Sequence, residues 1–170
     1  MNAPQTIEDL MTQALAIERE AVARYNELAD IMQMHNNAEV AALFRQMAGY
    51  EQHHVQHILA EMGWADDVVS PLHGGMWTTP EAPETVAFED VHYLMHPWHA
   101  LKLALKAEER AQAFFEQLAR DATSDAIRRA AEEMRDEEAE HVALVKQWMA
   151  KVPKPDADWA EDPDPPRYID

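Results

Sequence analysis

The sequence predicts an all-α fold, a four-helix bundle with one long connection between its second and third helices. Three observations lead to this prediction. The 170 residues include only four glycines, while alanine, glutamate, leucine and methionine are plentiful, and this composition favours helices. Apolar residues recur at helical spacing over four long stretches. Short turns join the first two stretches and the last two, whereas the segment 63–97 separates the two pairs.

The first half of the chain contains two expected helices, from about Thr6 to Met34 and from about Ala38 to Met62. The tight turn at 35–37 makes them antiparallel neighbours. Gly63 can end the second helix, because glycine readily adopts the left-handed conformation of a helix C-terminus. The expected core stripes of this half consist of Ile7, Leu10, Met11, Ala14, Ala21, Tyr25, Leu28, Met32, Val40, Leu43, Phe44, Met47, Val55, Ile58 and Met62.

The second half contains two further helices. The third is expected from about Pro97 to Arg120, since proline suits a first helical turn. A turn at 121–124 follows, and Thr123 or Ser124 can cap the fourth helix, which runs to about Lys151. The expected core stripes of this half consist of Leu101, Ala104, Leu105, Ala111, Phe115, Leu118, Ile127, Ala130, Met134, Val145 and Trp148.

These elements define one bundle over residues 1–151, with a crossover at 63–97 that is long enough to cross the bundle lengthwise. Residues 152–170 form a C-terminal tail rich in Pro and Asp. Its prolines prevent the fourth helix from continuing. The tail is either disordered or lies over the bundle, with Trp159 and Tyr168 as anchors.

Composition excludes several classes of function. Asp and Glu number 32 against 14 Lys and Arg, giving a formal net charge of −18 at pH 7, so nucleic-acid binding lacks the basic surface that it needs. The absence of cysteine excludes disulfides, thiolate metal sites and cysteine nucleophiles. No apolar run is long enough to span a membrane. The first twenty residues lack the pattern of a secretory signal, and we therefore expect a cytoplasmic protein.

Both halves of the chain carry the same pattern of acidic residues and histidines: a lone glutamate on the first helix of the pair and Glu-x-x-His on the second. The six residues are Glu18, Glu51, His54, Glu108, Glu138 and His141. All lie on otherwise apolar stripes. Residues three apart on a helix differ by about 60° in direction, so the two residues of each Glu-x-x-His motif can reach one ion. Four carboxylates and two imidazoles are costly to bury unless cations lie among them.

The pattern therefore predicts two divalent metal ions, whose charge balances four ionised carboxylates. One glutamate from each of two helices and Glu-x-x-His from each of the other two is the known ligand pattern of di-iron and di-manganese bundles. These ligands suit iron, manganese or zinc, and iron is our first expectation. Without metal, we expect the buried carboxylates to repel one another and to have raised pKa values. The alternative is a bundle without metal, since a single Glu-x-x-His is common in charged helices.

The helices that carry these residues resemble those of a known family. Two stretches of this chain resemble the E-x-x-A-x-x-F/Y-Y signature of the rubrerythrin branch of ferritin-like proteins: Glu18-x-x-Ala21-x-x-x-Tyr25 and Glu108-x-x-Ala111-x-x-Phe114-Phe115. Two further stretches resemble the partner helices of that family: Met47-Ala48-x-x-Glu51-x-x-His54 and the acidic run Asp136-Glu137-Glu138-x-x-His141. The resemblance covers residues 6–62 and 97–150. It implies a ferritin-like bundle with a di-iron carboxylate site and a homodimeric assembly.

Two features depart from rubrerythrins proper. Those proteins carry a cysteine-rich rubredoxin-like module that delivers electrons, and this chain has no cysteine, so an external electron donor is needed. They also have an additional glutamate three residues after the third-helix ligand, where this chain has Ala111. The simpler site of four glutamates and two histidines remains.

Further expectations concern Tyr25, its counterpart in the second half, and three histidines near the start of the third helix. The hydroxyl of Tyr25 is expected to bond a ligand carboxylate, as groups around metal ligands usually do. Its equivalent in the second half is Phe115, so the two metal positions are expected to differ. His92, His96 and His99 cluster before and at the start of the third helix; they are either ordinary surface histidines or an auxiliary metal or proton-relay site.

The function implied by the resemblance is an oxidoreductase that reacts with peroxide or oxygen at a di-iron site. One alternative is an iron-binding protein that oxidises or stores iron, although the sequence after Lys151 offers no fifth helix for assembly into a cage. A second alternative is a bundle in which metal is structural or absent.

Overall fold

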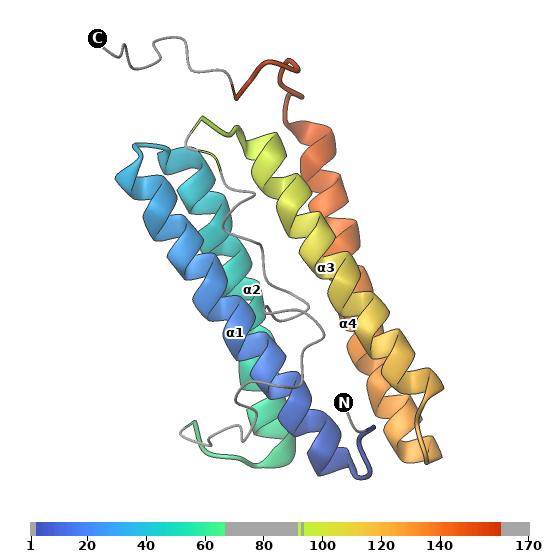
Figure 1. The fold of residues 1–170 in the computed structure, drawn as a ribbon. Coiled ribbons are helices and arrows are strands. Elements are labelled where there is room, and N and C mark those ends of the chain that lie inside the picture. Colours follow the sequence, from blue (N-terminus) through green and yellow to red (C-terminus); the bar gives the residue numbers. More distant parts are fainter. Residues whose placement is uncertain (1–2, 67–91, 93, 161–170) are drawn as a thin grey trace, which may run out of the picture.

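The computed structural model describes residues 3–66, 92 and 94–160. Four helices account for most of them: α1 (Ile7–Met34), α2 (Ala38–Met62), α3 (Pro97–Arg120) and α4 (Asp125–Lys151). These bounds agree with the expected ones to within a residue or so, and the all-α four-helix bundle with one crossover is confirmed (Figure 1).

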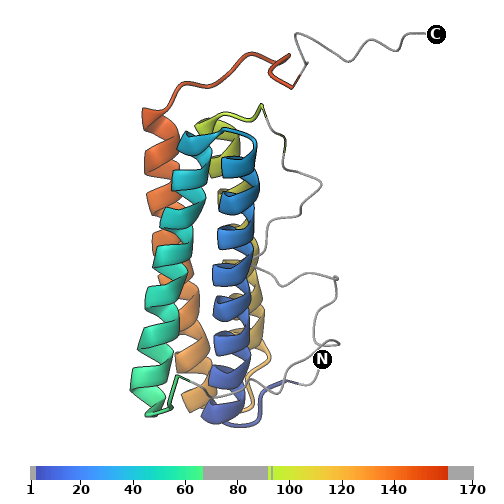
Figure 2. The same cartoon turned by 90° about the vertical axis from the view of Figure 1, so that its left-hand side faces the viewer.

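The helices pack as two antiparallel pairs. α1 packs mainly on α2, and α3 mainly on α4. The two pairs stand side by side in Figure 1, and in Figure 2 the α1–α2 pair lies in front of the α3–α4 pair. α2 ends at one end of the bundle and α3 begins at the other. There, the side-chain amide of Asn37 donates to the carbonyl of Met95 at 2.6 Å, which joins the α1–α2 turn to the segment before α3. The described ends of α2 and α3 therefore lie at opposite ends of the bundle, and most of the predicted crossover, residues 67–91 and 93, lies outside the described residues.

Local side chains fix where the helices begin and end. Thr6 caps α1, accepting a hydrogen bond from the backbone N–H of Asp9 at 3.0 Å, while the Asp9 carboxylate accepts one from the N–H of Thr6 at 3.1 Å. Asn37 and Ser124 cap α2 and α4 in the same manner. Gly63 ends α2 with a left-handed φ of 65°. Of the two capping residues considered for α4, the chain uses Ser124.

The apolar core consists of two clusters, one toward each end of the bundle. The first includes Tyr25, Leu28, Met32, Val40, Phe44, Met47, Leu101, Ala104 and Val145. The second includes Leu10, Ala14, Leu15, Ile17, Val55, Ile58, Phe115, Ile127 and Met134. Leu15 and Ile17 are fully buried although the expected stripe left them out, because α1 buries a wider face than that stripe. Along every helix the boundary between the clusters falls at the glutamates and histidines singled out above.

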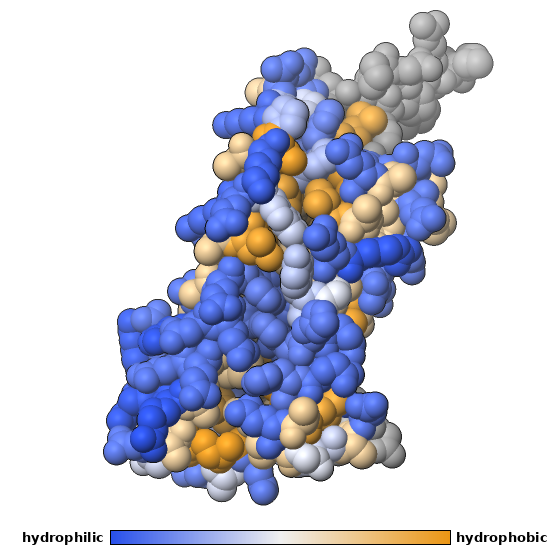
Figure 3. Space-filling view, turned by 180° about the vertical axis from the view of Figure 1, so that it is seen from behind, coloured by the Kyte–Doolittle hydropathy of each residue, from blue (hydrophilic) through white to orange (hydrophobic). Residues whose placement is uncertain are grey.

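The surface is mainly hydrophilic, as the excess of acidic residues implies. Figure 3 shows the face seen from behind Figure 1, where hydrophilic side chains predominate and apolar patches are confined to smaller areas. Within the described residues, no helix combines the length and apolar composition that a membrane span needs. Of the expected tail anchors, Trp159 packs against the first core cluster, and Tyr168 lies outside the described residues.

The two glycines of α2 and its C-terminus should respond to alanine in opposite ways. Neither has an atom within 4 Å of where a Cβ would be placed, so backbone conformation alone decides the outcome. Gly49→Ala should stabilise the protein by about 0.5–1 kcal/mol, since glycine is unfavourable inside a helix. Gly63→Ala should destabilise it by about 1 kcal/mol, because a side chain is strained at positive φ. Urea unfolding of the two variants measures both changes; equal effects would contradict the C-terminal conformation assigned to Gly63.

Candidate metal centre

The structure brings the six residues together in the layer between the two core clusters. We call them the carboxylate–histidine cluster: Glu18 from α1, Glu51 and His54 from α2, Glu108 from α3, and Glu138 and His141 from α4. The four glutamates are completely buried. The two imidazoles are slightly accessible, with side-chain exposures of 13% for His54 and 12% for His141. They stack with ring centroids 4.4 Å apart.

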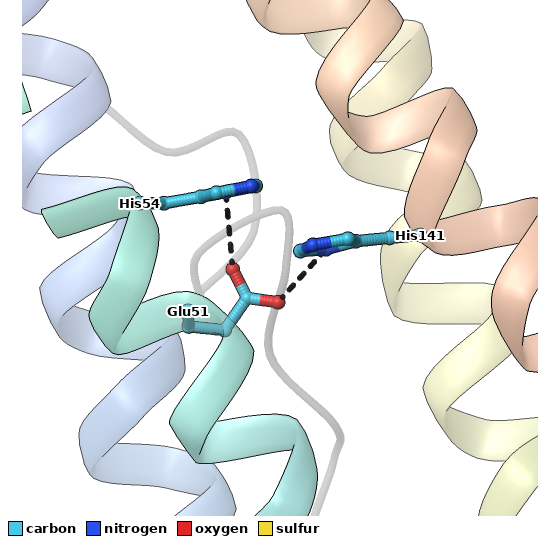
Figure 4. Close-up of side chains that lie close together, drawn as sticks. All are labelled: Glu51, His54 and His141. Carbon is cyan, nitrogen blue, oxygen red and sulfur yellow. Dashed lines mark ion pairs between the residues drawn. The ribbon is translucent and has the colours of Figure 1, made fainter. Parts of the chain in front are cut away.

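Glu51 lies between the two histidines. Its Oε2 is 3.7 Å from Nδ1 of His54, and its Oε1 is 3.3 Å from Nδ1 of His141. Figure 4 shows this carboxylate pointing from α2 toward both rings, one from its own helix and one from α4. A single carboxylate whose two oxygens address two imidazoles is placed to bridge two ions.

Glu138 occupies the corresponding position on α4. Its Oε1 is 3.5 Å from Nδ1 of His54 and its Oε2 is 4.0 Å from Nδ1 of His141. The other two glutamates each address one histidine: Glu18 Oε1 lies 3.2 Å from His54 Nδ1, and Glu108 Oε2 lies 3.3 Å from His141 Nδ1. Two carboxylates of the cluster therefore approach both histidines, and the contacts of the other two are with one histidine each.

The donor atoms fall into overlapping sets that could each hold a metal ion. In one set the donors come from Glu18, Glu51, His54 and Glu138; in another they come from Glu108, Glu138 and His141. Within each set the donor atoms lie within 4.8 Å of one another. Both oxygens of Glu51 and of Glu138 are buried without a hydrogen bond, an expensive situation for a carboxylate. Carboxylate and imidazole donors suit iron, manganese or zinc, so the residues present fit two such ions.

Without metal, protons supply part of the missing positive charge. Burial disfavours the charged form of His141, but the contacts with Glu108 and Glu51, together with their charges, outweigh burial and raise its pKa to about 11. Burial likewise opposes protonation of His54, and its contact with Glu138 and the charges of Glu51 and Glu138 raise its pKa nonetheless. The surrounding carboxylates therefore favour the protonated form of both imidazoles.

The pKa values of two of the carboxylates shift in opposite directions. Burial, reinforced by the charge of Glu51, raises the pKa of Glu108 well above its usual value, as expected for crowded carboxylates. The same expectation is wrong for Glu51. Although burial alone would raise its pKa, the contacts with His141 and Glu18 and the charges of both histidines lower it. The expectation failed because it treated the imidazoles as neutral.

Tyr25 makes the two halves of the cluster unequal. Its hydroxyl donates to Glu108 Oε1 at 3.4 Å, within the buried interior. The bond therefore goes to a carboxylate of the other helix pair. Phe115, the equivalent residue in the second half, is fully buried and has no hydroxyl. Ala111 is also fully buried and adds no carboxylate to the cluster.

The structure places one further acid, Glu137, at the rim of the cluster. The Oε2 atom of Glu137 lies 4.0 Å from Nε2 of His54, and its Oε1 lies 4.0 Å from Nε2 of His57. Burial raises the pKa of Glu137, against the effect of the two histidines. Helical periodicity places this residue off the core stripe, and no signal within α4 reveals that α2 presents two histidines to it.

The histidines before and at the start of α3 serve local structure. Nδ1 of His92 accepts from the backbone N–H of Leu94, and Nδ1 of His99 accepts from that of His96, both at 3.1 Å. The His99 ring stacks on Trp159 at 3.7 Å. Among the described residues, no set of potential metal donors includes any of the three.

Comparisons with known proteins agree with this architecture. The family model described as Rubrerythrin matches residues 9–87. A solved structure of an uncharacterized conserved protein from Magnetospirillum magnetotacticum MS-1 is 33% identical in sequence and superimposes with a TM-score of 0.64. That similarity covers 89% of this chain and 98% of the other. No curated protein sequence matches the chain.

Glu138→Gln should weaken metal binding strongly, because it removes the charge of a carboxylate that reaches both histidines. Removing a group that hydrogen-bonds a metal ligand typically lowers metal affinity by about 10–100-fold. Removing the charge of a ligand itself should therefore lower the affinity by at least about 100-fold. Glu140→Gln is the matched control, since Glu140 is exposed on the same helix. Competition of each variant with a chromophoric chelator for zinc measures the affinities. Equal affinities in the two variants would remove Glu138 from the site.

Stability of the protein without metal should decline as pH rises above neutrality. The pKa of His141 is about 11 in the folded protein, against a usual value of 6.5. Protonated His141 therefore contributes its full stabilisation of the folded state below pH 6.5, and this stabilisation is lost as the pH rises through about 11. The raised pKa of Glu108 acts in the same direction. Melting temperatures measured from roughly pH 7 to pH 10 should fall more steeply for the wild type than for His141→Gln. The exposed His53 provides the control: His53→Gln should keep the wild-type slope, and an unchanged slope in His141→Gln would refute the assignment.

Proposed function

The chain belongs to the rubrerythrin-like branch of the ferritin-like superfamily, and on this premise we propose that it is a di-iron oxidoreductase that reacts with hydrogen peroxide or dioxygen. The six residues of the carboxylate–histidine cluster are its proposed ligands. Manganese or zinc fit the same donors, and iron is proposed because the reaction requires a metal that changes oxidation state.

The observation that carries this proposal is the pair of bridging carboxylates. Glu51 and Glu138 each lie within 4.0 Å of both histidines, whereas a site for one ion needs no carboxylate between two imidazoles. Glu18 and Glu108 complete the two ends. Four carboxylates then match the charge of two divalent ions, and the buried oxygens that lack hydrogen bonds gain partners.

Two ferrous ions bound here would supply two electrons, enough with two protons to reduce hydrogen peroxide to two molecules of water. The chain's own residues hold and orient the site. Tyr25 keeps Glu108 in place through its hydroxyl. The apolar clusters on either side exclude bulk water. The slight exposure of His54 and His141 marks the side nearest to solvent, between α2 and α4, where a small oxidant could arrive.

Several features of the physiological setting belong to this proposal. A protein without cysteine cannot hold a thiolate iron centre for electron delivery, so the reducing electrons are proposed to come from an external donor. A homodimer and a cytoplasmic location are proposed on the family resemblance and the sequence composition. Nucleic acid is not a proposed partner, given the net charge of −18.

The reaction can be tested by loading the protein anaerobically with ferrous iron and then adding hydrogen peroxide or air-saturated buffer. The expected result is about two ferrous ions bound per chain and the appearance of a near-ultraviolet ferric absorption band. Glu138→Gln should lack both, whereas Glu140→Gln should keep both, because only the former alters a bridging carboxylate.

Other outcomes would select a different function. If neither oxidant produces the ferric band while two ions remain bound, the metal is structural and the oxidoreductase proposal fails. If ferric iron continues to accumulate far beyond two ions per chain and the protein elutes as a large assembly, the protein stores iron. If the protein takes up no iron, manganese or zinc, the bundle functions without metal.

A further inference from the structure

A cavity lies at the end of the bundle where α3 begins, and no residue of the carboxylate–histidine cluster lines it. Its volume is about 350 Å³, within the usual range of roughly 300–1,000 Å³ for small-molecule sites. One wall comes from the first turns of α3 and the other from the segment that follows α4. The residues important for the argument are Trp98, His99, Lys102, Lys106, Lys154 and Trp159.

The cavity concentrates positive charge in an acidic protein. The chain has five lysines, and Lys102, Lys106 and Lys154 all line this cavity, against a single acidic lining residue, Asp156. Burial and the neighbouring charges of His96 and Lys102 lower the pKa of His99, as expected where cations already gather. With a net charge of −18 over the whole chain, three lysines in one cavity point to an anionic ligand.

Two of the ammonium groups approach the same aromatic ring. Those of Lys102 and Lys154 lie over the ring of Trp98, at 5.2 Å and 5.3 Å from its centroid. One comes from α3 and the other from the segment after α4, so the fold, and not one helix, brings the two charges to the same indole. Cation–π contacts partly compensate such charges, and an anion between the two lysines would compensate them more fully.

Three aromatic rings, those of Trp98, His99 and Trp159, form a further part of the lining. The ring of Trp159 stacks on that of His99 with centroids 3.7 Å apart, and the ring of Trp98 meets His99 edge-on at 5.4 Å. Trp159 also packs against the first core cluster, which anchors the segment that closes the cavity. Indole and imidazole rings provide contact area for a planar ligand.

We propose that this cavity binds a small aromatic anion, with its carboxylate or phosphate between Lys102 and Lys154 and its ring against the indoles of Trp98 and Trp159. The site is independent of the carboxylate–histidine cluster and does not require metal there. The ligand needs both a ring, which contacts the indoles, and a negative charge, which contacts the lysines.

The test uses isothermal titration calorimetry of the purified full-length protein with three probes: 1-naphthyl phosphate, 1-naphthol and inorganic phosphate. The first combines ring and charge, and the other two separate them. We expect 1-naphthyl phosphate to bind with about one molecule per chain and at least about tenfold more tightly than either of the others. Raising the salt concentration should weaken it, because the lysines are near the surface.

Variants locate the site. Lys102→Gln and Lys154→Gln should each weaken binding of 1-naphthyl phosphate by about tenfold, the usual effect of losing one charge-assisted contact. Lys146→Gln is the matched control, because Lys146 is exposed on α4 and does not line the cavity. All three lysines lie outside the core, so melting temperatures should remain close to that of the wild type.

Four results would overturn the proposal. Equal affinity for 1-naphthol would make the cavity simply apolar, and equal affinity for inorganic phosphate would make it a general anion site. A loss in Lys146→Gln as large as in Lys102→Gln would show attraction to the whole protein and not to this cavity. If 1-naphthyl phosphate does not bind detectably at millimolar concentration, the cavity is not a site for aromatic anions.

Discussion

The burial of four carboxylates in one layer is the constraint on which the rest of this structure depends. Glu18, Glu51, Glu108 and Glu138 have no exposed surface, and ionised groups are buried only with compensating charge. The cluster offers two compensations. When metal is absent, the raised pKa values of His54 and His141 favour protons there, and the two divalent ions proposed above would compensate the same carboxylates. Because both compensations act at the same donor atoms, metal binding has to displace protons, and affinity for metal should rise with pH.

This polar layer shapes the bundle around it. The apolar core is divided into two clusters, and each helix contributes apolar side chains to both clusters and carboxylate or imidazole side chains to the layer between them. Long helices with well-defined caps hold that boundary in register, since a shift of one residue in any helix would turn a glutamate out of the layer. Tyr25 shows how closely the layers are joined: it belongs to the first apolar cluster and bonds Glu108 in the polar one.

Periodicity was sufficient to predict the helices and to select six residues from many acids and histidines, because burial on a helix repeats with a fixed spacing. It could not predict relations between helices. The bond of Tyr25 to Glu108 depends on how α1 faces α3, and the approach of Glu137 to His54 depends on how α4 faces α2. The lowered pKa of Glu51 also depends on such a contact, with His141. The positively charged cavity joins lysines from α3 and from the segment after α4, which are distant in sequence.

The central claim is that the layer holds two metal ions bridged by Glu51 and Glu138. A crystal structure of protein loaded with ferrous iron, with diffraction data collected on either side of the iron absorption edge, tests it most directly. Two anomalous peaks, one beside His54 and one beside His141, with both bridging carboxylates between them, are the predicted result. A single peak, or peaks outside the carboxylate–histidine cluster, would contradict the account.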